Sequence, residues 1–307
     1  MAKKVVAAGL TPAWQRLLEF SRLELGRVNR AHSSQSFAAG KSVNVALAVY
    51  SLGGDVRAIL PLGGANGENL RRDLEKIRLP FRDLETRAET RVCTTLVDHE
   101  SGCVTELVEE AVPLSDSEWE KWDALCAEEF ASGGVVVISG SLPQGVPSKK
   151  YAEMCELASR SGAQMVLDFR GEGLLECLKF RPLVVKPNRK ELEATVGFAL
   201  HDEARLIEAA RQLNVLGARW VIVSDGPGTL LVVSSEETRR FVPREAVPQV
   251  SQEGRTIPLC PIGCGDALTG GLALALARDE TIESAVAQGM EAAFKNLYQF
   301  TTCRFFA

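Results

Sequence analysis

The 307-residue chain is 46% hydrophobic and 24% charged, which is ordinary for a globular protein with a sizeable core. Its net charge of −5 argues against a broad basic surface for nucleic acid, and no apolar run approaches the roughly 20 residues that cross a bilayer. The eight cysteines form no CxxC pair, so metal-ligand spacing is absent and we expect a reducing, cytoplasmic setting.

Short β-rich segments alternate with helical patterns along most of the sequence. The alternation predicts one α/β domain over residues 1–307, with a doubly wound, mostly parallel sheet flanked by helices. In chain order we expect a strand at 4–10, a helix at 42–54, a strand at 55–64, helices at 68–77 and 117–130, a strand at 134–140, a helix at 148–161, strands at 163–169 and 182–188, a helix at 203–217, a strand at 219–225 and a helix at 265–278.

Two insertions interrupt this alternation, at approximately 11–36 and 88–111. The second contains two β-rich stretches around "HESG", which is a hairpin signal, with no crossover helix between them. We interpret the insertions as a small antiparallel β sheet that stands off the main one. Because ligands of open α/β sheets bind at the carboxyl ends of the strands, such a sheet is expected to act as a lid.

The segment "PIGCGDALTGG" (261–271) precedes a long apolar helix. Gly263 and Gly265 lack side chains, so the amides of Gly263, Cys264 and Gly265 can approach an anion at the helix N-terminus. Asp266 has two interpretations. It is either a general base that takes the proton of a hydroxyl attacking a phosphoryl group, or an ordinary helix cap.

Five further polar residues stand at the predicted ends of strands or starts of helices. Lys41 precedes an apolar helix, where it either holds an oxyanion or is a surface lysine, and Asn44 lies one turn into that helix. In "KPNRKEL", Asn188 and Glu191 share a helix face, where they either hold the water shell of Mg²⁺ or form a capping box. Lys186 is placed to reach nucleotide phosphates.

These motifs, taken together, resemble the PfkB (ribokinase-like) carbohydrate kinases. "PIGCGDALTGG" is similar to the C-terminal signature of the family, nearest to the 1-phosphofructokinase and tagatose-6-phosphate kinase group, and "AAGKSVNVALAVYSLGG" (38–54) is similar to the N-terminal one. Further matches follow in family order: "LTPA", "GRVNRA", "TR", "VTEL", "SGSLPQGVP", "LDF", "KPNRKEL" and "VSDGPGTLLV". The resemblance covers nearly the whole chain.

The resemblance implies ATP- and Mg²⁺-dependent phosphorylation of a sugar-phosphate hydroxyl, with Asp266 as base. It places Arg91 and Arg27 on the phosphate of the acceptor and Asn44 on the sugar, and it implies a possible homodimer through the β lid. The remaining residues implied for the acceptor are Gln15, Gly40, Lys41 and Ser139, and those for the nucleotide and metal are Lys186, Asn188, Glu191, Ser224, Gly226 and Gly228.

The sequence departs from the family pattern mainly at the end that reads the sugar. Gln15 stands where the resembling families have an aspartate, Ala39 where they have a glycine, and Cys260 where they have asparagine or aspartate. Two alternatives to a sugar-phosphate kinase follow. One is a non-catalytic sugar-phosphate-binding protein descended from such a kinase, and the other is a kinase for a free sugar or a nucleoside.

Overall fold

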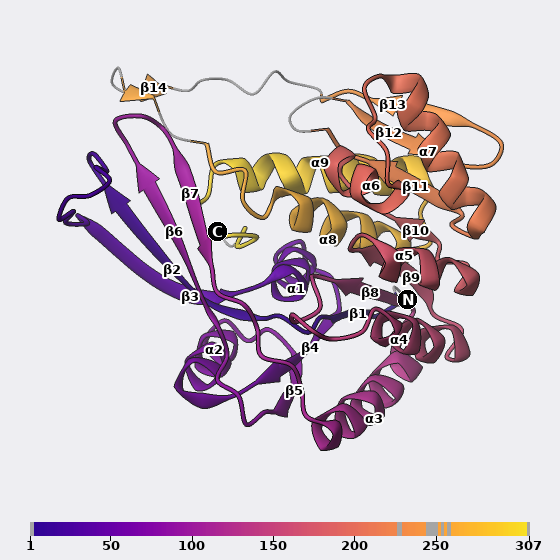
Figure 1. Cartoon of the computed structure of the whole chain (residues 1–307), viewed down its shortest axis with the longest axis horizontal. Coiled ribbons are helices and arrows are strands. Elements are labelled where there is room, and N and C mark those ends of the chain that lie inside the picture. Colours follow the sequence, from indigo (N-terminus) through magenta and orange to yellow (C-terminus); the bar gives the residue numbers. More distant parts are fainter. Residues whose placement is uncertain (1–2, 226–228, 244–250, 253–254, 257–258, 306–307) are drawn as a thin grey trace.

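A nine-stranded sheet forms the centre of the computed structural model, which describes residues 3–225, 229–243, 251–252, 255–256 and 259–305 (Figure 1). Seven strands are parallel, and at one edge two more are added through antiparallel pairings. In spatial order they are β13 (Thr238–Phe241), β12 (Leu230–Val233), β11 (Trp220–Val223), β10 (Val184–Val185), β9 (Gln164–Asp168), β8 (Val135–Ser139), β1 (Val5–Ala8), β4 (Val56–Leu62) and β5 (Phe81–Glu85).

Helices cover both faces of this sheet, which explains its near-continuous apolar strands. One face packs on α1 (Lys41–Ser51), α2 (Gly64–Lys76), α8 (Cys264–Ala277) and α9 (Ile282–Leu297). The other packs on α3 (Asp116–Ser132), α4 (Lys149–Arg160), α5 (Glu172–Cys177), α6 (Arg189–Val196) and α7 (Glu203–Leu216), with a short 3₁₀ turn at Leu178–Phe180.

Strand β1 shows how the sheet divides the core. Val5 and Ala7 point into the cluster beneath α1 and α8, whereas Val6 and Ala8 point into the cluster beneath α3 and α4. All four side chains are fully buried. The alternation follows from the pleat, which sends successive side chains to opposite faces.

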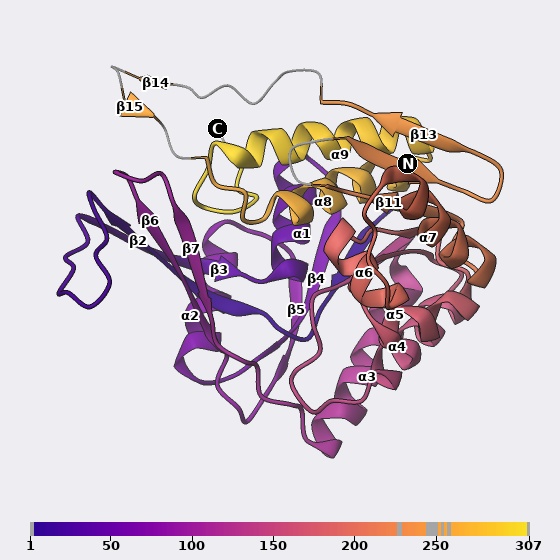
Figure 2. The same ribbon diagram turned by 45° about the horizontal axis from the view of Figure 1, so that its top comes forward.

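A second sheet of four strands stands away from the main one, as Figures 1 and 2 show from two directions. Its order is β3 (Ser33–Ala39), β2 (Ala13–Phe20), β6 (Val92–Asp98) and β7 (Val104–Val108). The hairpin pairs β2–β3 and β6–β7 are antiparallel, while the central pair β2–β6 is parallel. A small core of Leu17, Phe37, Ala39 and Val97 holds this lid sheet together.

The structure confirms the mostly parallel sheet flanked by helices and the small additional sheet. The elements absent from the sequence-based prediction are β5, β12, β13, α5 and α9, together with the two-residue pair β14 (Ser251–Gln252) and β15 (Arg255–Thr256). Among the helices of the described residues, none combines the length and apolarity needed to cross a membrane.

Candidate active site

The N-terminus of α8 is shaped by two glycines with different tasks. Gly263 caps the helix in a left-handed conformation, with φ of 80°, and a Cβ there would lie 2.8 Å from Cγ2 of Thr302. Only glycine fits both constraints. At Gly265 a Cβ would instead project toward the Lys186 amine, 3.7 Å away. The first glycine therefore makes the turn, and the second leaves space between the helix N-terminus and a cation.

Asp266 lies in the first turn of α8 and is only 7% exposed. Its carboxylate accepts a hydrogen bond of 2.7 Å from the side-chain amide of Asn44 on α1, and Thr302 donates in turn to the amide oxygen of Asn44 at 3.1 Å. Burial raises the pKa of Asp266 to about 6, although Lys41 acts to lower it. A carboxylate with this pKa can accept a proton near neutral pH.

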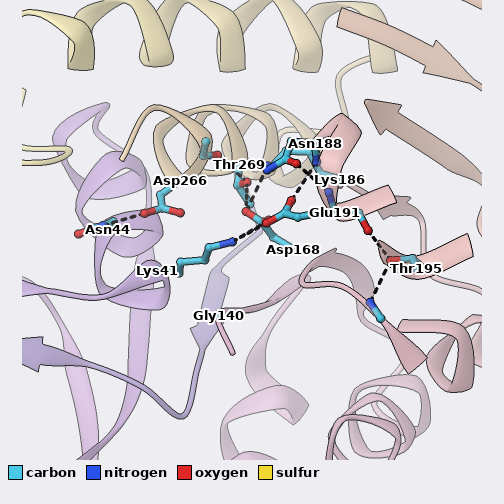
Figure 3. A network of polar contacts seen from close by, with 12 residues as sticks. Lys41, Asn44, Gly140, Asp168, Lys186, Asn188, Glu191, Thr195, Asp266 and Thr269 are labelled. Atoms are coloured by element: carbon cyan, nitrogen blue, oxygen red, sulfur yellow. Dashed lines mark hydrogen bonds and ion pairs between the residues drawn. The ribbon is translucent and has the colours of Figure 1, made fainter. Parts of the chain in front are cut away.

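Two lysines meet the carboxylate of Asp168, at the end of β9 (Figure 3). The Lys41 amine lies 3.6 Å from Asp168 and 3.5 Å from Glu191, and the Lys186 amine lies 3.3 Å from Asp168. Thr269 on α8 also donates to Asp168, at 2.8 Å. Burial acts to raise the pKa of Asp168, but the two lysines hold it below its usual value, so the group is an anion.

The start of α6 forms a capping box, which is one of the two arrangements predicted from the spacing of Asn188 and Glu191. The Asn188 side chain accepts from the Glu191 amide at 2.8 Å, and the Glu191 side chain accepts from the Asn188 amide at 2.9 Å. The other Glu191 oxygen faces Lys41. Ser224 forms an isolated parallel bridge with Asn188, so the two strand ends lie side by side. Capping and a place in the charged network therefore coexist.

Residues 302–304, together with α9, support the glycine turn at the start of α8. The buried Asn296 of α9 donates to the carbonyl of Ile262 at 2.7 Å and accepts from the amide of Cys303 at 2.8 Å. Arg304 pairs with Asp73 of α2. The setting of Asp266 and its glycines thus depends on helices α1, α8 and α9 and on the segment that follows α9.

A cleft of about 570 Å³ opens beside this network, between the lid, the end of β8 and the β9–α5 connection. Lys41 and Glu191 lie on its inner side, where they border the charged network. Arg91 lines it from the lid side, with its guanidinium donating to the carbonyls of Thr11 at 2.9 Å and Glu109 at 3.1 Å. Further lining residues include Ser141, Tyr151, Phe169 and Arg170.

Several predicted acceptor residues lie in or near this region. Gly40 has φ of 108° and directly precedes α1. Gln15 is buried in the lid sheet, where its amide donates to the Thr95 hydroxyl at 2.8 Å. Ser139 is the last residue of β8 and its buried hydroxyl has no partner in the described part of the chain, whereas the nearby Ser141 lines the cleft. The serine that borders the open space is thus two residues further on.

Arg27 is the predicted site residue that the single chain does not bring to the others. It is exposed and belongs to the connection between β2 and β3. This connection lies at the end of the lid that points away from α8 (Figures 1 and 2). The predicted nucleotide contacts Gly226 and Gly228 lie outside the described residues.

Asp168 was missed by sequence reasoning, although it is the hub of the charged network. The available signal was its position: it ends a buried parallel strand, beside the strand that leads to Lys186. Thr269, which bonds Asp168, and Ser141 were missed as well. No group of three or more metal-ligating side chains gathers anywhere in the described ranges.

Chemically, the arrangement brings a proton acceptor, a helix N-terminus and two lysines close together, and Lys41 also borders the cleft. The N-terminus and the lysines favour a polyanion such as a nucleotide phosphate. A buried base beside an anion-binding helix N-terminus is suited to activating a hydroxyl for phosphoryl transfer.

Comparison with known proteins agrees with this geometry. The model of the pfkB family of carbohydrate kinases matches residues 2–302. The chain is 32% identical to a 1-phosphofructokinase of Xanthomonas campestris pv. campestris, over 92% of this chain and 86% of the relative. It is 33% identical to an ATP-dependent 6-phosphofructokinase isozyme 2 of Escherichia coli, over 82% of this chain and 79% of the relative.

Solved structures give the same result. A crystal structure of phosphofructokinase-2 from Escherichia coli in complex with fructose-6-phosphate superposes with a TM-score of 0.85 at 30% identity, covering 96% of this chain and 93% of that one. Arabidopsis thaliana ribokinase, at 18% identity and a TM-score of 0.76, shares the fold. The chain therefore belongs to the pfkB family of carbohydrate kinases, and it is a phosphotransferase.

Proposed function

We propose that this pfkB-family kinase transfers the terminal phosphoryl group of ATP to a hydroxyl of a hexose phosphate. The observation that carries the proposal is Asp266, a buried carboxylate with a pKa of about 6 in the first turn of α8, beside glycines that leave the helix N-terminus open. The relatives include 1-phosphofructokinase, 6-phosphofructokinase and tagatose-6-phosphate kinase, all of which are named for phosphorylated sugars.

Asp266 is the proposed general base. Its carboxylate takes the proton of the acceptor hydroxyl while the hydroxyl oxygen attacks the terminal phosphorus, and the bond from that phosphorus to the bridging oxygen breaks to leave ADP. The backbone amides of Gly263, Cys264 and Gly265 stabilise the negative charge on the transferring group. Asn44 holds the Asp266 carboxylate in place through its hydrogen bond of 2.7 Å.

The nucleotide phosphates are proposed to lie between α8 and the two lysines. Lys186 faces the space that Gly265 leaves open, and Lys41 lies where Asp168 and Glu191 meet. Asn188 and Ser224, whose strand ends are bridged, are placed to contact the nucleotide, with Gly226 and Gly228 following in sequence.

The donor set also fits a magnesium ion. Asp168 and Glu191 are two carboxylates within 3.6 Å and 3.5 Å of one lysine amine, so they border a common space. Mg²⁺ commonly binds one or two carboxylates together with phosphate oxygens and water. When bound, the ion supplies neutralisation of the phosphate charge. Asn188 and Glu191 would hold it through water, with Asp168 nearby.

The acceptor is proposed to occupy the cleft beneath the lid. Arg91 offers its guanidinium to the acceptor phosphate, and its hydrogen bonds within the described residues go to the carbonyls of Thr11 and Glu109, not to a carboxylate. Gln15, Gly40, Lys41, Asn44 and the serines at 139 and 141 are proposed to surround the sugar. Lid closure would keep water from competing with the acceptor hydroxyl.

We also propose a homodimer through the lid and a cytosolic location. On the edge strand β7, Leu107 is 53% exposed and Val108 is 54% exposed. In the β2–β3 connection, Leu25 and Val28 are exposed to an even larger fraction. A tetrameric inhibited form is described for the phosphofructokinase-2 of Escherichia coli. All eight cysteines are free thiols, in keeping with a reducing compartment.

The proposal is tested by ADP release with Mg²⁺ and ATP across a panel of fructose 6-phosphate, fructose 1-phosphate, tagatose 6-phosphate, fructose and adenosine. Turnover that requires a phosphorylated sugar and disappears in Asp266→Asn is expected. Tight binding of a sugar phosphate without any turnover would favour a non-catalytic binding protein, and turnover of fructose or adenosine alone would contradict the assigned acceptor class.

A further inference from the structure

Arg170 is a cation that lines the proposed acceptor cleft. It is exposed at the end of β9, two residues after Asp168, and it makes no hydrogen bond or ion pair within the described ranges. The other two cations of the cleft are engaged. Lys41 pairs with Asp168 and Glu191, and Arg91 donates to two backbone carbonyls.

The segment that carries Arg170 is fixed on both sides. The Phe169 ring stacks on Tyr151 with centroids 3.8 Å apart and planes 5° from parallel, and the Tyr151 hydroxyl donates to the carbonyl of Gly140. On the other side, the Gly171 amide donates to Thr195 of α6 at 2.9 Å. The backbone at Arg170 is therefore held in place, while its side chain remains free to meet a ligand.

The charges that line the cleft favour the binding of an anion. Its lining contains three cations (Lys41, Arg91, Arg170) and two acids (Glu172, Glu191). Glu191 is paired with Lys41, and Glu172 forms no ion pair with Arg170 in the part of the chain described. Among the described residues, neither of the two guanidinium groups in the cleft is hydrogen-bonded to a carboxylate. Each presents a planar fork of donors, so the two together are suited to binding a phosphate.

We infer that Arg170 binds the phosphate of the acceptor together with Arg91, so that one chain supplies two arginines to the phosphate site. The inference rests on the proposed function and adds Arg170 to the expected residues Arg91 and Arg27. Arg170 lines the same cleft as Arg91, Ser141 and Lys41. Arg170 is thus a specificity-determining residue for a phosphorylated acceptor.

The test measures binding without nucleotide, by titration calorimetry of the full chain with fructose 6-phosphate, fructose 1-phosphate and tagatose 6-phosphate. Arg170→Ala should lower the affinity for the tightest-binding sugar phosphate at least tenfold. Arg170→Lys, which keeps the charge, should lose less of the affinity. The matched control is Arg205→Ala, which removes an exposed arginine of α7 and should bind as the wild type does.

Each outcome separates the inference from the proposed function. If the wild type binds and phosphorylates a sugar phosphate and Arg170→Ala binds it equally well, the inference is wrong and the proposed function stands. If no sugar phosphate binds to the wild type, both are wrong. Melting temperatures of the variants should stay within about a degree or two, because an exposed, unpaired arginine contributes little to stability.

Discussion

The side-chain amide of Asn44 donates a hydrogen bond of 2.7 Å to the Asp266 carboxylate, across 222 residues of sequence. The contact joins α1 to the first turn of α8 and fixes the orientation of the proposed base. It also gives the base a neighbour that favours its ionised form, against the burial that opposes it.

Asp266→Asn should lower kcat by about 10²–10⁴-fold while leaving ATP binding nearly unchanged, the usual span for a general base. The melting temperature at pH 8 should not fall, because asparagine removes a buried charge and still accepts from Asn44. Steady-state kinetics and thermal melts check this, with Asp279→Asn, an exposed acid, as control. Near-normal turnover with a lower melting temperature would instead identify Asp266 as a helix cap.

Activity should have an acidic limb with a midpoint near pH 6. Asp266 works as an anion and its pKa is raised to about 6, so kcat/KM should be fully developed above this pH and fall tenfold per unit below it. Asn44→Ala removes a donor that lowers this pKa, so the limb should move to higher pH. A pH profile of both proteins measures the shift. An unchanged midpoint in Asn44→Ala would mean that another group controls the limb.

Arg91→Ala should weaken the binding of a phosphorylated acceptor by roughly 1.5–3 kcal/mol, which is the typical contribution of a hydrogen bond to a charged group. The binding of a free sugar should hardly change. Because Arg91 also donates to the carbonyls of Thr11 and Glu109, the melting temperature must be followed in parallel. Arg91→Lys serves as the variant that keeps the charge. Equal losses for fructose and fructose 6-phosphate would show that Arg91 does not read a phosphate.

The two glycines at α8 should respond differently to alanine. Gly263→Ala forces a side chain into a left-handed turn and against Thr302, so it should destabilise the protein by about 1 kcal/mol or more. Gly265→Ala adds a methyl group at an ordinary distance from Lys186, so folding should be kept, while phosphate binding and kcat should fall. Thermal melts and kinetics of the pair check this. Full activity in a stable Gly265→Ala protein would exclude phosphate from that space.

Gln15→Asp should improve kcat/KM for fructose 1-phosphate or tagatose 6-phosphate by about tenfold, or 1.4 kcal/mol. The Gln15 side-chain amide already donates a hydrogen bond to the Thr95 hydroxyl. An aspartate carboxylate has only acceptors, so it can accept hydrogen bonds from two adjacent sugar hydroxyls. We therefore expect the wild type to use these two sugars poorly. Efficient wild-type turnover of either, lost in Gln15→Asp, would show that Gln15 already reads the sugar well.

The sequence alone predicted the helices and strands whose formation depends on short-range patterns. The expected helix at 265–278 is observed at Cys264–Ala277, and the expected strand at 134–140 at Val135–Ser139. The run at 182–188 yielded only the two-residue strand β10, because the chain turns there into the capping box of α6. Helix α9 was not predicted, although it packs its apolar side on α8.

The parts of the site that escaped prediction depend on contacts between distant segments. Asp168 is an isolated acid near the end of a predicted strand, and only the fold brings Lys41 and Lys186 to it. Arg170 is likewise an isolated basic residue until the cleft unites it with Arg91. Long-range juxtapositions of this kind leave no periodicity or spacing for sequence reasoning to detect.

The hydrogen bond from Thr302 to Asn44 joins two residues that are synthesised far apart in time. The two residues are 258 positions apart, and at about 5–20 residues per second the ribosome needs on the order of 10–50 s to get from one to the other. Throughout that interval α1 exists without the segment that braces its asparagine. The hydrogen-bonded chain of Asp266, Asn44 and Thr302 can therefore form only after residue 302 has been synthesised, long after α1.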